Sequence, residues 1–179
     1  MVYRFIVLSD ETEEFRRDIV IDGEASFFAL NNAILESVGF TKSEITSFFL
    51  CNENWEKDTE VTLVEKNTSS DIDCFVMDST RLDELIDEED QRLLFVFEEL
   101  TERAFMVELK EITYDDPPFD PLCVRSEGVP PKQFTDFEDF DTQSVVENAK
   151  AGIFAEDDNF DDGYNDEDFN DLNESDPWS

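Results

Sequence analysis

The alternation of hydrophobic and polar residues predicts β-strands near the start of the chain and again around residues 92–112. Val2 to Leu8 and Asp18 to Asp22 are rich in apolar and β-branched residues, and the charged segment between them indicates that they form a hairpin. Arg92 to Glu98 is continuously apolar in its centre, which predicts a strand covered on both faces. Ala104 to Ile112 alternates instead, as expected for a half-exposed hairpin partner.

Two further strands are expected in the middle of the chain. They are Thr46 to Cys51 and Glu60 to Glu65, on either side of a loop that contains Trp55. The polar run from Lys66 to Asp73 is expected to be a loop that tolerates insertion.

One main helix is predicted between Ser26 and Gly39, since serine is a favourable N-cap and glycine ends a helix readily. Its apolar positions recur at helical spacing: Phe27, Leu30, Ile34 and Val38. A weak capping box from Thr80 to Asp83 predicts a second, short helix. The apolar face of this short helix consists of Leu82, Leu85 and Ile86. Together the elements predict an α+β fold with a mixed or antiparallel sheet.

Prolines mark the end of this folded part. They lie at five positions: Pro117, Pro118, Pro121, Pro130 and Pro131. Because proline has no backbone donor, regular structure is expected to stop there. The chain is therefore predicted to consist of a domain over residues 1–132 and an irregular acidic tail over residues 133–179.

The tail combines acidity with aromatic rings. Gln133 to Ser179 contains 16 Asp or Glu residues, eight aromatic residues and a single basic residue, Lys150. A solvating linker would lack the rings, and a folded domain would have regularly spaced aliphatic residues, so the tail is expected to be disordered unless bound. The tail residues predicted to bind a partner are rings and the acids between them: Phe154, Asp157, Asp158, Phe160, Asp161, Asp162, Tyr164, Asp166, Glu167, Asp168, Phe169, Asp171 and Trp178.

The charge of the chain favours a basic protein partner. The formal net charge is -35, which opposes direct binding to nucleic acid or to an anionic membrane. A basic surface of a transcription, translation or DNA-processing complex would attract the acids and accept the rings, as it accepts phosphates and bases. Nucleic-acid mimicry by the tail is the leading hypothesis. The alternative is an adaptor or regulator that acts through its folded domain, with a tail that only solubilises.

The composition points away from an enzyme. The chain has no histidine, and its five glycines form no phosphate-binding loop, so neither a catalytic triad nor a nucleotide site is expected.

Cys51, Cys74 and Cys123 form no CxxC pair and are expected to be buried, reduced thiols of a cytoplasmic protein. No segment has the length of a signal peptide or a membrane span, and no cofactor or metal site is predicted.

Several short patterns resemble a known family. They are the strand Tyr3 to Leu8, the helix end at Val38-Gly39-Phe40, a strand with Phe48, the helix Leu82 to Ile86, and the residues Pro121, Cys123, Gly128 and Pro130-Pro131. These patterns resemble the plasmid pRi open-reading-frame-three-like family, also described as TnpR-like passenger proteins of insertion elements. The resemblance covers residues 1–133 and implies an α+β fold.

One turn departs from the pattern of that family. Between its last two strands the family usually has a Tyr-Asp-Phe-Gly-Asp-like turn followed by Trp and often His, whereas this chain has Phe97 to Phe105 there. Any activity that depends on the usual turn is expected to be absent.

Overall fold

The computed structural model describes residues 1–66 and 72–135. Within these residues the chain forms eight strands and two helices. In chain order they are β1 (Val2–Leu8), β2 (Arg16–Asp22), α1 (Phe27–Val38), β3 (Ser47–Cys51), β4 (Lys57–Thr62), β5 (Cys74–Val76), α2 (Leu82–Leu85), β6 (Arg92–Glu98), β7 (Arg103–Thr113) and β8 (Leu122–Glu127). Met1–Phe134 forms one compact unit, which contains all of these elements.

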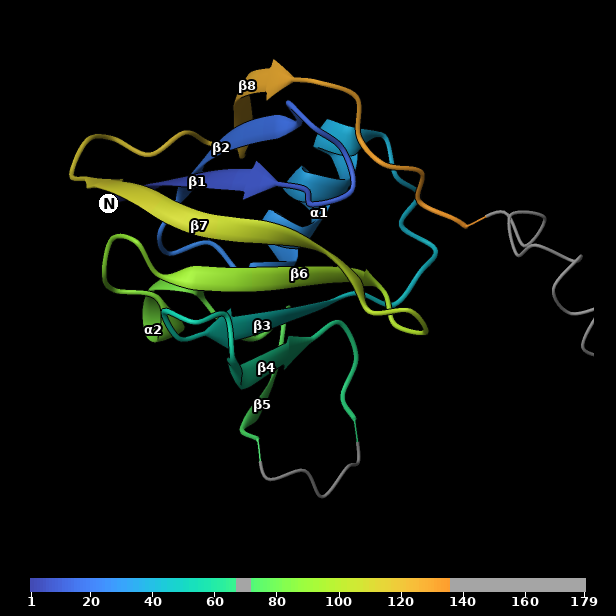
Figure 1. Ribbon diagram of the computed structural model, residues 1–179. Coiled ribbons are helices and arrows are strands. Elements are labelled where there is room, and N and C mark those ends of the chain that lie inside the picture. Colours follow the sequence, from blue (N-terminus) through green and yellow to red (C-terminus); the bar gives the residue numbers. More distant parts are fainter. Residues whose placement is uncertain (67–71, 136–179) are drawn as a thin grey trace, which may run out of the picture. The chain divides into compact units, whose positions relative to one another are not determined.

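The strands form a single mixed sheet in the order β5-β4-β3-β6-β7-β1-β2-β8. All neighbouring strands are antiparallel except β4 and β5, which are parallel. Helix α1 lies behind the sheet in the view of Figure 1, so it packs on one face. The structure thus confirms the predicted α+β class, with one main helix and one short helix.

The residues expected to cap the main helix do so. The Ser26 hydroxyl accepts a hydrogen bond from the backbone N–H of Ala29 at 3.2 Å. Gly39 ends the helix in the left-handed conformation, at φ 70°, which glycine adopts without a Cβ clash. The short helix α2 begins one residue later than predicted. Its N-cap is Arg81, whose backbone N–H donates to the Glu84 carboxylate at 3.4 Å.

The core lies between α1 and the face of the sheet that α1 covers, and it is rich in phenylalanine. The ring of Phe105 lies 4.8 Å from that of Phe97 and 5.2 Å from that of Phe15, measured between centroids. Phe48 and Phe95 are 4.8 Å apart on the neighbouring strands. All five rings are buried, so these aromatic contacts account for much of the apolar surface that folding removes from water.

Arg103, at the start of β7, fixes the end of the described chain. Its guanidinium pairs with Glu11 at 2.8 Å and with Glu98 at 3.3 Å. It also donates to the backbone carbonyls of Lys132, at 2.6 Å, and Gln133, at 3.2 Å. The Gln133 side chain accepts from the backbone N–H of Thr41 and donates to its carbonyl. These contacts, called the Arg103 clamp below, hold Gln133 within the folded unit.

Regular structure does not stop at the prolines, contrary to the prediction. Strand β8 forms between Pro121 and Pro130, because Leu122 to Glu127 contains no proline and pairs on one side only, with β2.

The predicted strand at residues 60–65 lies three residues too far along the chain. The Asn52 side chain accepts from the backbone N–H groups of Asn54 and Glu56, which ends the turn early and lets β4 begin at Lys57. The three-residue strand β5 was not predicted.

Two predictions of burial are also wrong in part. In β6, Leu94 is only half-buried, because no helix of the described residues covers the second face of the sheet. The cysteines are free, but Cys74 and Cys123 are exposed and Cys51 is half-buried. Cys74 and Cys123 lie in the two edge strands, β5 and β8, where few neighbours can cover them.

Candidate functional site

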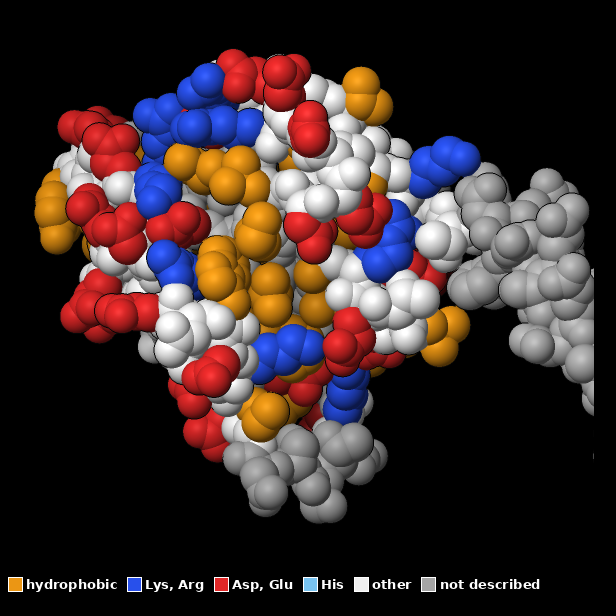
Figure 2. Space-filling model, viewed as in Figure 1, with side chains coloured by type: hydrophobic (Ala, Val, Ile, Leu, Met, Phe, Trp, Pro, Cys, Tyr) orange, Lys and Arg blue, Asp and Glu red, His pale blue; other side chains and the backbone are white. Residues whose placement is uncertain are grey.

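The face of the sheet opposite α1, called the open face below, has a row of apolar side chains. The strand registers place Phe49 beside Leu94, Leu94 beside Met106, and Met106 beside Leu8, so that the row crosses β3, β6, β7 and β1. All four side chains remain half-buried. Figure 2 shows hydrophobic side chains gathered in the middle of this face, with Lys and Arg side chains around them. Interaction surfaces often have such an arrangement, with apolar side chains in the centre and charged side chains around them.

One end of the open face has a buried carboxylate beneath arginines. Asp18 is completely buried and accepts from Arg4 at 2.7 Å and from Arg16 at 2.6 Å. Burial alone would raise the pKa of Asp18, but the hydrogen bonds from Arg16 and Arg4 outweigh it, so this pKa lies below its usual value. Arg125 of β8 is the cross-strand neighbour of Asp18 and pairs with Glu127 at 2.8 Å. The arginines of this cluster are thus already paired with carboxylates.

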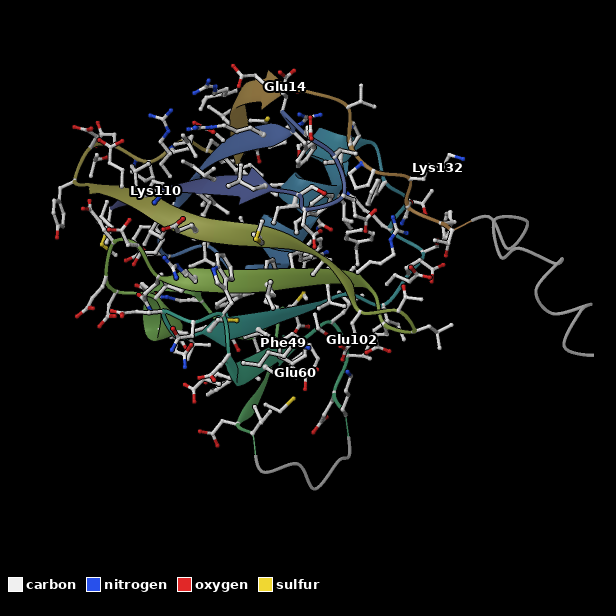
Figure 3. The ribbon with its side chains drawn as sticks, in the orientation of Figure 1. Glu14, Phe49, Glu60, Glu102, Lys110 and Lys132 are labelled. Atoms are coloured by element: carbon white, nitrogen blue, oxygen red, sulfur yellow. The ribbon has the colours of Figure 1, made fainter. Side chains whose placement is uncertain are left out.

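The other end of the open face has a groove of about 420 Å³ between strands β3 and β4 and the turn that joins β6 to β7. Its polar lining consists of Ser47, Lys57, Glu60, Lys66, Glu99 and Glu102, and its apolar lining of Phe49, Val96 and Leu100. In Figure 3 the labelled side chains of Phe49, Glu60 and Glu102 lie close together at this end. The turn that departs from the family pattern therefore forms one wall of the groove.

Each lysine of the groove is held by carboxylates. Lys66 lies 3.0 Å from Glu60 and 2.7 Å from Glu99. Burial alone would lower the pKa of Lys66, but hydrogen bonds to these two carboxylates outweigh it, so the pKa is raised and the ammonium stays charged. Lys57 lies 3.6 Å from Glu102 and places its ammonium 4.3 Å from the centre of the Phe49 ring. The ring of Phe49 thus already accepts a cation.

A buried hydroxyl at the groove lacks a partner. Ser47 is 1% exposed, and its Oγ makes no hydrogen bond to any residue that the structure describes. Ser47 lines the groove, so a group bound there could satisfy the hydroxyl. Buried polar groups are usually hydrogen-bonded, so an unsatisfied one such as this hydroxyl calls for an explanation.

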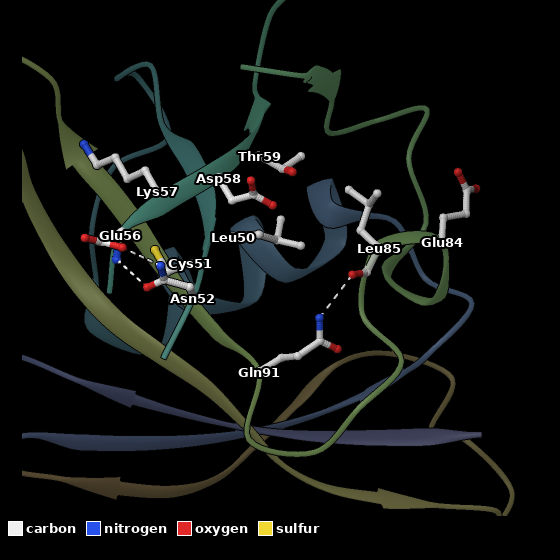
Figure 4. A pocket seen from close by; sticks show the side chains of 10 residues that line it. All are labelled: Leu50, Cys51, Asn52, Glu56, Lys57, Asp58, Thr59, Glu84, Leu85 and Gln91. Atoms are coloured by element: carbon white, nitrogen blue, oxygen red, sulfur yellow. Dashed lines mark hydrogen bonds between the residues drawn. The ribbon is translucent and has the colours of Figure 1, made fainter. Parts of the chain in front are cut away.

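A second pocket, shown in Figure 4, lies beside α2 and has about 490 Å³. Its polar groups bond to one another: Asn52 donates to Glu56 at 2.6 Å, and Gln91 donates to the carbonyl of Leu85 at 3.3 Å. The Cys51 thiol at its edge has a pKa raised by burial, which disfavours the thiolate. This arrangement supports local structure and gives no sign of a reactive group.

The residues that the sequence predicted as binding residues, from Phe154 to Trp178, all lie outside the described residues. Sequence reasoning also missed the groove, because its lining comes from four separate segments. The unusual turn at residues 98–103 is the one signal in the sequence, and by itself it predicts only the loss of an activity. Within residues 1–66 and 72–135, no group of acidic or cysteine side chains is placed to hold a metal ion.

Comparisons with known proteins agree with this fold. A model of the plasmid pRiA4b ORF-3-like protein family matches residues 2–162, so the match continues past residue 133, where the resemblance was expected to end. A crystal structure of a protein of unknown function from Methanosarcina mazei Go1 is similar, with a TM-score of 0.59 and 14% identity over 92% of this chain and 93% of that chain. No curated protein matches. In the described part of the chain, no helix is long and apolar enough to cross a membrane.

Proposed function

Because the chain belongs to the plasmid pRiA4b ORF-3-like family, whose description states no activity, we propose its function from geometry and charge. The chain is a non-enzymatic adaptor that binds a basic protein partner through the open face of its folded unit. The observation that carries this proposal is the half-exposed row of Phe49, Leu94, Met106 and Leu8.

Charge selects the kind of partner. Residues 1–132 contain 32 acidic and 12 basic residues, so a basic protein is attracted over a long range. The cations of the open face do not oppose this, because carboxylates pair with them: Arg16 with Asp18, Lys66 with Glu60, and Lys110 with Glu108. The apolar row would then supply the short-range contact.

A second candidate is nucleic-acid mimicry by the tail, Gln133 to Ser179. It is favoured by the 16 acidic residues and eight rings of that segment. The carboxylates would steer the tail to a basic, nucleic-acid-binding surface of a transcription, translation or DNA-processing complex, and the rings would anchor it there. In this case the folded unit docks beside the tail.

Two variants separate the candidates. A version that ends at Thr135 removes the tail but keeps the Arg103 clamp, whereas one that ends at Lys132 would also remove Gln133 from it. Leu94→Asn disrupts the apolar row, and Phe28→Asn is the matched control, since Phe28 is a 41% exposed residue on α1.

The measurement is affinity purification at low and high salt, with quantification of the same basic proteins for every variant. If the adaptor proposal is correct, Leu94→Asn loses the basic partner while the shortened chain and Phe28→Asn keep it. If mimicry is correct, only the shortened chain loses the basic partner. Retention of the same partners by both Leu94→Asn and the shortened chain would contradict both candidates.

A further inference from the structure

The groove beneath the β6–β7 turn has more negative than positive groups. Three carboxylates, from Glu60, Glu99 and Glu102, face two ammonium groups, from Lys57 and Lys66, among its described lining residues. Glu102 is the least engaged carboxylate of the three, because its side chain is 75% exposed and its distance to Lys57 is 3.6 Å. The described lining of the groove therefore has a negative net charge.

A cation fits this groove better than an anion. An anion would have to separate Lys66 from Glu60 and Glu99, which it contacts at 3.0 and 2.7 Å, and would have to approach a strongly acidic molecule. A cation needs only to pair with the carboxylate of Glu102 and to take the place of the Lys57 ammonium over the Phe49 ring, or to lie beside it. The ring face is suited to this exchange, since a cation over an aromatic face is attracted by the negative charge density of the ring.

The side chains that line the groove favour a planar cation with several donors. A guanidinium can stack on the Phe49 ring, donate in parallel to the two oxygens of Glu102, and direct a further N–H to Ser47. Ser47 Oγ is buried and has no hydrogen-bond partner among the described residues, so such a donor would satisfy it. The stem of an arginine side chain would lie against Val96 and Leu100, the aliphatic lining.

We propose that this groove receives an arginine side chain of the basic protein partner. In the free protein Lys57 occupies the position over Phe49, and the incoming guanidinium displaces it toward solvent. The inference rests on the proposed function, because it names the residue of the partner that the folded unit recognises.

The test uses the full chain and a defined probe, N-acetyl-arginine amide, followed by two-dimensional NMR of the backbone amides. Saturable shifts are expected at Ser47, Phe49 and Glu102, and the lysine analogue of the probe should bind more weakly. Glu102→Gln should lower the affinity for the arginine probe about tenfold, the effect of losing one charge-assisted hydrogen bond. Ser47→Ala should also lower this affinity while leaving the fold intact.

Glu36→Gln is the matched control. Like Glu102, Glu36 is an exposed carboxylate that pairs with a lysine, in this case Lys42. It lies at the end of α1, away from the lining of the groove. Equal weakening by Glu36→Gln and Glu102→Gln would show that the probe senses only net charge, which would overturn the proposal. Preferential binding of N-acetyl-aspartate amide at Lys57 and Lys66 would overturn it too.

The outcome can be separated from that of the proposed function. If the arginine probe does not bind at the groove but Leu94→Asn still loses the partner, the arginine site is wrong and the adaptor proposal stands. If the probe binds as expected and Leu94→Asn keeps the partner, the groove recognises arginine but the apolar row is not the docking surface.

Discussion

The two faces of the sheet come from the same strands but differ in what they stabilise. Toward α1, β6 and β7 present Phe95, Phe97 and Phe105, which are fully buried and in mutual contact. On the open face the alternate positions, among them Leu94 and Met106, are half-buried and adjoin paired charges. The inner face therefore contributes more buried apolar surface, whereas the apolar side chains of the open face remain partly in contact with solvent.

The contrast extends to charge. The inner face contains mostly apolar side chains, whereas the open face has ions of both signs in direct pairs, such as Arg4 with Asp18 and Lys66 with Glu99. Exposed pairs such as Lys66 with Glu99 contribute little to stability. Charged and polar side chains also surround the apolar centre of many protein interfaces.

The largest expected effect tests the two faces directly at neighbouring positions of β6. Phe95→Ala should lower the free energy of unfolding by about 3–5 kcal/mol, because it leaves a cavity among Phe48 and Phe105. Leu94→Ala should lower it by about 1 kcal/mol, because Leu94 is already half in water. Urea denaturation measures both. Equal losses would show that the two faces contribute equally to stability.

A smaller effect is expected at Asp18, the buried carboxylate of the open face. At neutral pH, Asp18→Asn should destabilise the protein by about 2 kcal/mol, since it removes the charged partner of Arg4 and Arg16. Because the pKa of Asp18 is lowered in the folded state, its stabilisation is present above pH ~4, the value for an unfolded aspartate, and is lost as pH falls further.

The difference in unfolding free energy between wild type and Asp18→Asn should therefore shrink below pH ~4. Chemical denaturation over a pH series measures it, with Asp58→Asn, an exposed carboxylate of β4, as the control. A difference that stays constant across the acid range would mean that Asp18 is not ionised beneath its arginines.

The smallest effect is expected for an exposed pair of the open face. Lys110 contacts Glu108 at 2.7 Å and Asp90 at 3.1 Å, yet Lys110→Met should change the unfolding free energy by less than about 1 kcal/mol. Thermal or urea unfolding at low and high salt checks this. A loss of several kcal/mol would assign the charges of the open face a structural role and weaken the division between the faces.

Local patterns were enough to predict the elements whose structure is decided by near neighbours in sequence. Ser26 and Gly39 cap the two ends of α1 as predicted, and the predicted ranges of β1 and β6 match the observed ones. Helix caps and hydrophobic alternation depend on residues only a few positions apart. The later prolines were misleading, since β8 depends on its long-range pairing with β2.

The groove could not be predicted for a related reason. Ser47, Lys66 and Glu102 lie far apart in the chain, and only the order β4-β3-β6-β7 brings them together. An unpaired buried hydroxyl has no sequence signature, because the partners of a serine side chain depend on contacts with residues distant in the sequence. The tail residues proposed for binding lie outside the described part of the chain, so mimicry remains a prediction.

The Arg103 clamp has a mechanical consequence. The chain leaves β7, forms β8 at the far edge of the sheet, and returns to the beginning of β7, where Arg103 holds the carbonyls of Lys132 and Gln133. A pull on the chain beyond Gln133 therefore acts on the contacts with Arg103 and Thr41 as well as on the pairing of β8 with β2. The end of the folded unit is thereby attached to the interior of the sheet and not to its edge alone.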